Sequence, residues 1–405
     1  MNNSKQLLKN SIKLIVFSLL VISTSYASEI DDIKKSMMLN YIEQTNNNKI
    51  IKKENEQLIQ QNSIYYKNIV ATARKYYQEY IAKSWGEENV KLSTKKTFTQ
   101  YSKDMKEREN IDFEKGTVTL EIVTEVNKKI EPKRFEEKLK ELKNENINQA
   151  IDKDPVAKLS KEYLKKKEIV KLELPKKEKD KFLKDLIENT KIKANQIKER
   201  IIELKDGKKK KIVSVVVQMV PKHLEKRAKR YKQDVFTQAK KFNVTPSHVF
   251  GTIQTESYFN PLAISHVPAY GLMQIVPSSA GKDAYEALTG KKRLLAPPYL
   301  YNAKNNIELG TKYIQVIKER YLRGVENEES LFYCTATAYN AGIGTLIKSF
   351  TGSYRKRKEA IAMINSMTPK EVYQHLRTSR RLNKEARNYV KKLKNYSQNY
   401  HKWDL

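Results

Sequence analysis

Glu256 is the side chain of this sequence whose position best suits acid–base chemistry. It follows a predicted helix start at Thr245 and Pro246, because threonine caps helices well and proline fits the first turn. Val249, Ile253 and Glu256 are spaced i, i+4 and i+7, which places the carboxyl group on the same helix face as two apolar side chains. A carboxyl group in apolar surroundings keeps its proton near neutral pH, since burial penalises the charged form. The pattern suits a general acid. For an isolated glutamate, however, a solvent-exposed side chain at the end of an amphipathic helix is the better interpretation, and only the motifs that follow favour the acid.

Further polar residues follow Glu256 in an ordered series of short motifs. The series comprises Ser257, Asn260-Pro261, Ser265, GLMQ at residues 271–274, AYNAG at residues 338–342 and EARNYV at residues 385–390. Each motif alone is a weak signal, but this many in one order is not expected by chance. The series resembles the lytic transglycosylases with a lysozyme-like domain, and residues 257–285 resemble the membrane-bound lytic murein transglycosylase C group. The resemblance covers the chain from residue 212 to the C-terminal region, and more weakly residues 98–126.

The resemblance implies cleavage of peptidoglycan with one carboxyl group in place of the usual pair. Glu256 would first donate a proton to the leaving glycosidic oxygen. The N-acetyl group of the substrate would then shelter the anomeric carbon, and Glu256 as base would take the proton of the muramyl C6 hydroxyl, giving a 1,6-anhydro end. Water is not consumed, so the expected enzyme is a lyase. The sequence does not exclude Asp283 or Glu308 as a second carboxylate, although the family pattern assigns neither that role.

The resemblance also implies a set of substrate-binding residues. Ser265 matches a serine that hydrogen-bonds the N-acetyl group, and Gln274 matches a glutamine that lines the sugar cleft. Gly271 would let the backbone approach the saccharide. Two roles stay open for Met273, contact with a sugar face or filling of the core, and Leu272 is expected in the core.

Two motifs nearer the C-terminus complete the predicted site. Tyr339 and Asn340 match a pair that closes the far wall of the cleft, with Tyr339 placed to hydrogen-bond Glu256 and tune its protonation. Tyr389 would reach the cleft from the last motif, in which Ala386 stands where the family usually has threonine.

The elements that position these residues are predicted to be mainly helical. A helix beginning at His223 carries one apolar face and leads to the helix of Glu256, and a capping box at Thr368 opens another helix. Pro221 marks the expected start of a lysozyme-like catalytic domain over residues 221–405.

Residues 28–220 are predicted to form a smaller mixed α/β domain whose role does not follow from the sequence. Aromatic residues at helical spacing favour a helix within residues 28–81, and residues 97–126 alternate like half-buried strands. The Lys/Glu-rich tract 127–205 is expected to be a solvated helical connector. An Asp-Gly pair follows it and predicts a hairpin that closes onto a strand at 212–217. The expected fold class is therefore α+β overall.

The N-terminus has the pattern of a secretory signal peptide over residues 1–27. Lysines precede an apolar run at residues 14–22, which is too short for an ordinary membrane-spanning helix, and a small-x-small cleavage site ends at Ala27. We expect export to the periplasm, with a retained N-terminal anchor as the alternative. The enzymes of the group are typically lipoproteins, but no cysteine stands near Ala27 to be acylated, which leaves peripheral membrane association open.

Charge and residue types limit the partners and cofactors. Lys and Arg total 79 against 47 Asp and Glu, and the net charge of +32 suits polyanions such as cell-wall polymers or nucleic acid. The export signal and the lack of a recognised binding motif argue against nucleic acid. The histidines show no metal-ligand spacing and no Gly-rich phosphate loop occurs, so neither a metal nor another cofactor is expected. A lone cysteine, Cys334, in an apolar stretch predicts a buried, unreactive thiol.

Two competing functions would keep the same fold. One is a lysozyme-type hydrolase, whose products would carry reducing ends. The other is a non-catalytic scaffold that binds peptidoglycan and releases no soluble product. The sequence indicates no oligomeric state.

Overall fold

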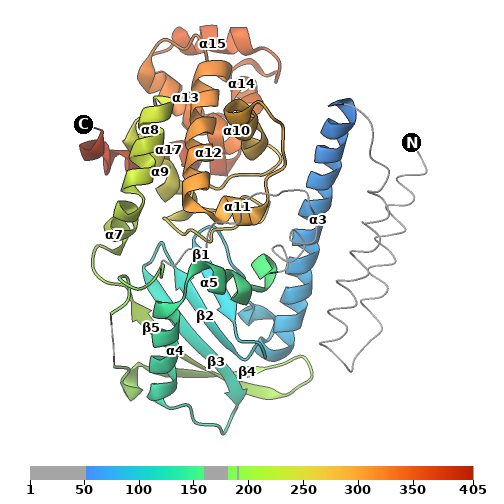
Figure 1. Ribbon diagram of the computed structural model, residues 1–405, viewed down its shortest axis with the longest axis vertical. Coiled ribbons are helices and arrows are strands. Elements are labelled where there is room, and N and C mark those ends of the chain that lie inside the picture. Colours follow the sequence, from blue (N-terminus) through green and yellow to red (C-terminus); the bar gives the residue numbers. More distant parts are fainter. Residues whose placement is uncertain (1–51, 159–180, 189–190, 405) are drawn as a thin grey trace, which may run out of the picture. The chain divides into compact units, whose positions relative to one another are not determined.

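The computed structural model describes residues 52–158, 181–188 and 191–404, so the predicted signal peptide at residues 1–27 lies outside it. From residue 59 onward the chain forms one compact unit, in which a sheet region is followed by a helical region (Figure 1). The elements of the sheet region are α3 (Lys52–Trp85), β1 (Thr97–Tyr101), β2 (Glu107–Asp112), β3 (Thr117–Glu125), α4 (Pro132–Asn144), α5 (Ile147–Lys153), β4 (Lys198–Glu203) and β5 (Lys209–Gln218). None of the described helices combines the length and the apolar character needed to cross a membrane.

The strands form one antiparallel sheet in the order β1-β2-β3-β5-β4. The long strands β3 and β5 pair at its centre, with Val118 opposite Val217. Gly207, at φ 78°, lies in the turn between β4 and β5, where the Asp-Gly pair predicted a hairpin. The predicted strands within residues 97–126 and at 212–217 are confirmed, and β4 comes from the charged tract.

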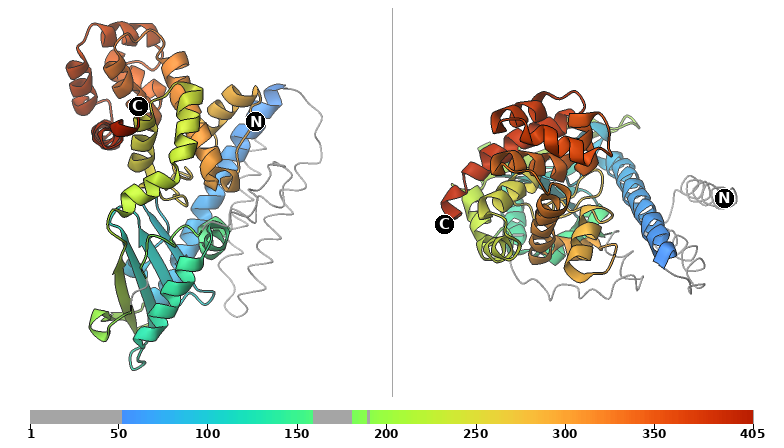
Figure 2. Two further views of the ribbon diagram at one scale, coloured as in Figure 1. Left: turned by 60° about the vertical axis from the view of Figure 1, so that its left-hand side comes forward. Right: turned by 90° about the horizontal axis from the view of Figure 1, so that it is seen from above.

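Helices cover both faces of the sheet, because successive side chains of a strand point to opposite faces. Phe135 and Leu139 of α4 belong to the same core cluster as Leu120 of β3. Ile81 and Trp85 at the end of α3 belong to a second cluster, formed with strand residues of the other face. The two helices accordingly lie on opposite sides of the sheet (Figure 2). The helix predicted within residues 28–81 is confirmed for its described part.

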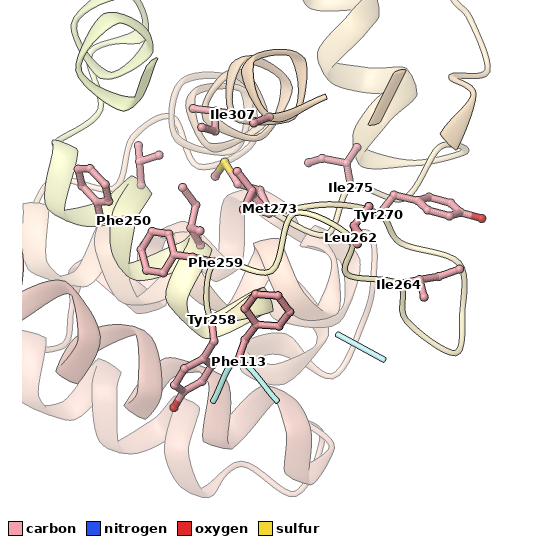
Figure 3. Close-up of a cluster of buried hydrophobic side chains, with 14 of the residues drawn as sticks. Phe113, Phe250, Tyr258, Phe259, Leu262, Ile264, Tyr270, Met273, Ile275 and Ile307 are labelled. Carbon is pink, nitrogen blue, oxygen red and sulfur yellow. The ribbon is translucent and has the colours of Figure 1, made fainter. Parts of the chain in front are cut away.

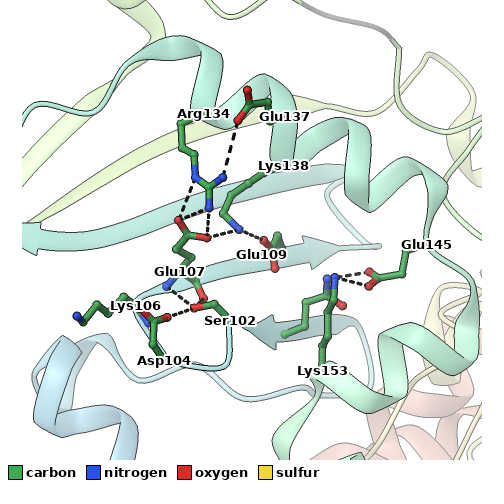
Figure 4. Close-up of polar contacts among 11 residues, drawn as sticks. Ser102, Asp104, Lys106, Glu107, Glu109, Arg134, Glu137, Lys138, Glu145 and Lys153 are labelled. Carbon is green, nitrogen blue, oxygen red and sulfur yellow. Dashed lines mark hydrogen bonds and ion pairs between the residues drawn. The ribbon is translucent and has the colours of Figure 1, made fainter.

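The expected solvated connector over residues 127–205 is wrong for the parts of that tract that the structure describes. Charged residues of α4 pair with β2 (Figure 4), where the Lys138 ammonium lies 2.6 Å from Glu107 and 2.8 Å from Glu109. Arg134 contacts Glu107 at 2.8 Å. Lys138 is buried, and its paired carboxylates offset the cost of removing its charge from water. This charge-rich segment therefore forms a helix that packs on the sheet, and its charged side chains are paired with the strand below.

The helical region confirms the prediction of a mainly helical C-terminal part and, with the sheet, the α+β class. Its helices are α7 (His223–Arg230), α8 (Lys232–Phe242), α9 (Pro246–Ser257), α10 (Ala280–Thr289), α11 (Pro297–Tyr301), α12 (Ala303–Val316), α13 (Glu328–Ala341), α14 (Ile343–Thr351), α15 (Arg357–Asn365), α16 (Pro369–Thr378) and α17 (Lys384–Gln398). Helix α9 packs against α8, α12 and α17 and is buried from Ser247 to its end. The Cys334 thiol is free and buried in α13, as predicted.

One hydrophobic core cluster continues from the sheet into the helical region. Phe113, directly after β2, belongs to it together with Tyr258 and Phe259 after α9 (Figure 3). Arg227 of α7 donates a hydrogen bond of 2.7 Å to the Phe113 carbonyl. The predicted domain boundary near residue 221 falls between β5 and α7, and it stays a prediction, because both regions lie in one compact unit.

Candidate active site

Helix α9 carries Glu256 in its last turn, and both ends of the helix are fixed. The predicted start at Thr245 is confirmed, but the Thr245 side chain makes no cap bond to the described residues. Asp404 supplies the cap instead, accepting a hydrogen bond of 2.7 Å from the Ser247 N–H. At the other end, Tyr258 adopts a left-handed φ of 51° and its N–H closes the last turn. Glu256 therefore stands where the helix stops and the chain turns away.

The carboxyl group of Glu256 is buried, since only 5% of the residue is exposed. Burial raises the pKa of Glu256 above its ordinary value, although nearby Lys95 and Tyr389 act to lower it. The Lys95 ammonium lies 3.7 Å from Oε2 of the carboxylate. The alternative of a solvent-exposed glutamate is therefore wrong. A carboxyl group with a raised pKa is suited to give up a proton near neutral pH.

The loop over residues 262–275 passes the end of α9 and folds back on itself. Tyr270 pairs as an antiparallel bridge with Ile264 and with Ile275. The Ser257 hydroxyl, next to the candidate acid, donates a hydrogen bond of 2.8 Å to the Leu272 carbonyl. The predicted motif residues 271–274 are thereby held against the helix end that carries Glu256.

Asn306 of α12 fastens the same loop from the other side. Its amide nitrogen donates to the carbonyls of Leu300 and Tyr270 at 2.7 and 2.8 Å. Its amide oxygen accepts from the Met273 N–H at 2.8 Å. Asn306 is completely buried, so these bonds form without competition from water.

Gly271 is required by the packing of this loop. It has φ 73°, and a Cβ there would lie 2.5 Å from the Leu300 carbonyl oxygen and 2.5 Å from Nδ2 of Asn306. The close approach that needs glycine is thus to α11 and α12. The expected approach of this backbone to a saccharide stays a prediction.

The structure favours the core role for Met273 of the two that the sequence left open. The Met273 side chain is fully buried, and its sulfur occupies the place that a Cβ on Gly310 would take. Leu272 is also in the core, as predicted. The side chain of Met273 has no exposed surface with which to meet a sugar in this conformation.

Ser265 and Gln274 are both buried in the loop, and they differ in how completely their polar atoms are hydrogen-bonded. The Ser265 hydroxyl donates to the Val267 carbonyl and accepts from the Ala269 N–H, so it is engaged within its own turn. Gln274, at a left-handed φ of 49°, donates from Nε2 to the Gly271 carbonyl at 3.0 Å. The Oε1 of Gln274 has no hydrogen-bond partner among the described residues, but the atom is buried and offers a ligand no surface in this conformation.

Tyr339 and Tyr389 both lie near Glu256, but Tyr339 does not make the contact expected of it. The Tyr339 hydroxyl donates to the Met273 carbonyl at 2.8 Å, which corrects the expected hydrogen bond to Glu256. Tyr389 of α17 is the tyrosine whose hydroxyl interacts with the Glu256 carboxylate and acts to lower its pKa, although it has no partner at ordinary hydrogen-bond geometry among the described residues. Burial and the charge of Glu256 raise the pKa of both phenols, so both stay protonated. Asn340 is partly buried at the end of α13.

The carboxylates left open by the sequence are engaged away from Glu256. Asp283 accepts a hydrogen bond of 3.4 Å from the Tyr321 hydroxyl, and Glu308 pairs with Lys241 at 2.8 Å. Glu385 of α17 is instead the carboxylate whose charge acts on Glu256.

The sequence did not predict that Lys95, Asn306 and Glu385 belong to this site. Asn306 could have been found from one signal, an amide on the apolar face of a predicted helix. Lys95 gave no such signal, because its ion pair joins it to Glu256, which is 161 positions away in the chain.

Family models match both regions of the chain. The Transglycosylase SLT domain matches residues 233–362, and the N-terminal domain of membrane-bound lytic murein transglycosylase C matches residues 52–140. The 70 kDa soluble lytic transglycosylase of Escherichia coli is similar over 43% of this chain and 24% of its own, at 23% identity and a TM-score of 0.33.

Curated relatives extend the match across both regions. The chain is 32% identical over 321 residues to "Membrane-bound lytic murein transglycosylase C" of Klebsiella pneumoniae strain 342, which covers 78% of this chain and 85% of that relative. The protein of the same name from Salmonella arizonae is 32% identical with the same coverage. The chain therefore belongs to the membrane-bound lytic murein transglycosylase C family.

Proposed function

We propose that this protein cleaves the β-1,4 bond between N-acetylmuramic acid and N-acetylglucosamine in peptidoglycan without using water, and that Glu256 is its acid–base group. The observation that carries the proposal is the buried Glu256 carboxyl group, whose pKa is raised by burial at the end of α9. Tyr339 and Tyr389 add two protonated phenols around it. One buried carboxyl group with a raised pKa suits a mechanism in which the same residue serves both steps.

In the first step the proton of Glu256 moves to the glycosidic oxygen while the bond from that oxygen to the anomeric carbon breaks. The electron pair of that bond leaves with the oxygen, and the N-acetyl group of the muramyl residue shares the positive charge left on the sugar. In the second step the muramyl O6 forms a bond to the anomeric carbon, and its proton passes to the Glu256 carboxylate. Glu256 ends protonated as it began, and the product is a 1,6-anhydromuramyl end.

The remaining polar groups fit the binding of sugar and acetamido groups. Asn340 offers a partly exposed amide, whereas the unpaired Oε1 of Gln274 would accept from a substrate N–H or O–H only if the loop uncovered it, because the atom is buried. Ser265 would contact an N-acetyl group only if its hydroxyl left the Val267 carbonyl. Both contacts therefore require a rearrangement of the loop over residues 262–275 when substrate binds.

The test is to digest purified sacculi with the protein and to weigh the released muropeptides by mass spectrometry. We expect anhydromuramyl products, each lighter by one water than the hydrolytic product. Glu256→Gln should release none, while Glu359→Gln, which makes the same change at an exposed carboxylate on α15, should match the parent. Thermal melting by circular dichroism checks that both variants fold.

Each other outcome points to a different function. Products with reducing ends would identify a lysozyme-type hydrolase, and stable binding to sacculi without soluble products would identify a scaffold. Full activity in a folded Glu256→Gln variant would remove Glu256 from the mechanism.

We infer further that the protein works in the periplasm, where its substrate lies, with peripheral attachment to the membrane as the form of contact. The signal-like pattern of residues 1–27 and the high positive charge support this location. Fractionation of cells, followed by a high-salt wash of the membranes, tests it. Release by salt is expected, and material that only detergent releases would indicate a retained anchor or a lipid.

A further inference from the structure

A tight turn of the sheet region reaches the buried carboxyl group of Glu256. The turn spans residues 94–97 and leads into β1, with Lys95 next to its start. The Thr94 N–H donates to the Thr97 carbonyl at 2.9 Å, and the hydroxyl groups of these two threonines lie 2.8 Å apart. Main-chain and side-chain bonds together leave such a turn little freedom. The fold of the sheet region therefore sets the direction in which Lys95 leaves the backbone.

The helical region holds the same turn through its main chain. Asn260 donates from Nδ2 to the Lys95 carbonyl at 3.3 Å, and the Ile264 N–H donates to the Thr94 carbonyl at 3.3 Å. Both donors belong to the stretch directly after α9, and Asn260 is fully buried. The backbone of Lys95 is thus fastened to the chain segment that follows Glu256.

The ammonium group of Lys95 is shared between two carboxylates. Its Nζ lies 3.7 Å from Glu256 and 3.3 Å from Glu385 of α17. Burial acts to lower the pKa of Lys95, but the charges of Glu256 and Glu385 outweigh it and the pKa is raised. Lys95 therefore remains a cation beside the candidate acid.

Building on the proposed function, we propose that Lys95 is a positioning residue of the active site: its ammonium group fixes the Glu256 carboxylate and stabilises the negative charge that forms there when Glu256 releases its proton. A charge that appears in a buried site is costly unless an opposite charge compensates it. Among the described residues, Lys95 is the cation that forms an ion pair with Glu256. The sheet region thereby completes the catalytic machinery of the helical region.

The neighbouring groups make the effect of Lys95 testable by its sign. Lys95 and Tyr389 favour the charged form of Glu256, whereas Glu385 disfavours it. Tyr339 also faces Glu256 and stays protonated. Removing Lys95 should raise the pKa of Glu256, and removing the charge of Glu385 should lower it.

The experiment measures kcat/KM against pH for the full chain on a soluble peptidoglycan oligosaccharide, because this profile reports the groups of the free enzyme. Activity that needs protonated Glu256 falls as pH rises through its pKa. Lys95→Met should move the midpoint of this fall up by roughly one pH unit and lower kcat by roughly three- to tenfold. Lys95→Arg should restore the parental midpoint, and Glu385→Gln should move it down.

Lys96→Met is the matched control, since Lys96 is the next residue of the same turn but pairs with Glu114 at 2.7 Å. It should leave the midpoint unchanged. A Lys95→Met midpoint equal to that of the parent, or a shift of the same sign in Lys95→Met and Glu385→Gln, would overturn the proposal. If Lys95→Met does not fold, Glu385→Gln alone decides, because its side chain is largely exposed and a midpoint that does not fall contradicts the proposal.

The proposed function fails separately from this inference. If the parent forms no anhydromuramyl product, the reaction itself is misassigned. If the parent forms that product and the midpoints do not move, the reaction stands and Lys95 has no part in it.

Discussion

The hydroxyl of Tyr339 donates a hydrogen bond of 2.8 Å to the main-chain carbonyl of Met273. This bond joins the last turn of α13 to the loop that passes the end of α9. Tyr339 therefore supports the backbone beside Glu256 instead of bonding the carboxylate itself. Tyr389, from α17, is left as the phenol that acts on the Glu256 charge.

Tyr339→Phe and Tyr389→Phe should consequently separate stability from acid–base tuning. Tyr339→Phe removes the donor of a buried carbonyl and should lower the free energy of unfolding by about 1–2 kcal/mol. Tyr389→Phe loses no hydrogen bond of ordinary geometry among the described residues, so its stability should change less. It should instead raise the pKa of Glu256, because Tyr389 acts to lower it. Urea denaturation and the pH dependence of kcat/KM measure the two effects.

The reverse pattern would contradict these assignments. A Tyr339→Phe variant with parental stability and a displaced pH profile would restore the hydrogen bond to Glu256 that the family resemblance implied.

Local patterns predicted what local forces decide. Proline at position 246 and the apolar spacing of Val249 and Ile253 predicted the helix and put Glu256 on its apolar face, and the motifs that follow favoured a buried carboxyl group over an exposed one. The alternating residues of β3 likewise predicted a strand, although its middle is buried on both faces and not on the single face expected. Such features depend on side chains a few positions apart, so a single sequence carries them.

Contacts between distant segments could not be predicted in the same way. Lys95 lies in a stretch of charged and polar residues that resembles any solvated turn. Its ion pair with Glu256 forms only because the sheet region contacts the end of α9. The tract that contains Lys138 has the composition of a solvated connector, because a sequence does not show whether charged side chains face water or each other. In the structure Lys138 pairs with two carboxylates of β2, and the helix that carries it packs on the sheet. The direction of the Tyr339 hydroxyl likewise follows from a loop conformation that the motif does not specify.

The free energy of unfolding of Glu256→Gln, relative to that of the parent, should increase as pH rises. The pKa of Glu256 is higher in the folded protein than in the unfolded chain, so protonated Glu256 stabilises the fold. This contribution is fully present below the ordinary pKa near 4.5 and is lost as pH rises through the folded pKa. Glutamine does not titrate, so the variant should gain on the parent with rising pH, by up to about 1.4 kcal/mol for each pH unit by which folding raises the pKa of Glu256. Urea denaturation from acid to mildly alkaline pH measures the difference. A gap that stays constant with pH would contradict a raised pKa.

Asn306→Ala should be strongly destabilising, since it removes one acceptor and two donor bonds from a fully buried site. Leaving the partner groups unpaired should cost about 3 kcal/mol or more. Asn305→Ala is the matched control on the same helix, because the Asn305 side chain makes a single long bond of 3.4 Å to the Tyr299 carbonyl. Its free energy of unfolding should fall by less than about 1 kcal/mol. Equal losses in the two variants would show that Asn306 does not fasten the loop.

Gly271→Ala and Gly290→Ala should differ although both glycines have left-handed backbone conformations, with φ of 73° and 70°. Nothing lies within 4 Å of the Cβ that alanine would add at position 290, so that variant should lose only the conformational term of about 1 kcal/mol. At position 271 the new Cβ would meet main-chain and amide atoms at 2.5 Å, and the loop must shift to relieve the contact. The free energy of unfolding of Gly271→Ala should fall by about 1–3 kcal/mol more than that of Gly290→Ala, as expected for overpacking.

The displaced loop should also lower activity on sacculi, because the Leu272 carbonyl accepts a hydrogen bond from Ser257 beside the catalytic carboxyl group. Equal stability losses in the two variants would mean that the loop yields without strain, and the close packing of α11 and α12 would then not be the reason for a glycine at this position.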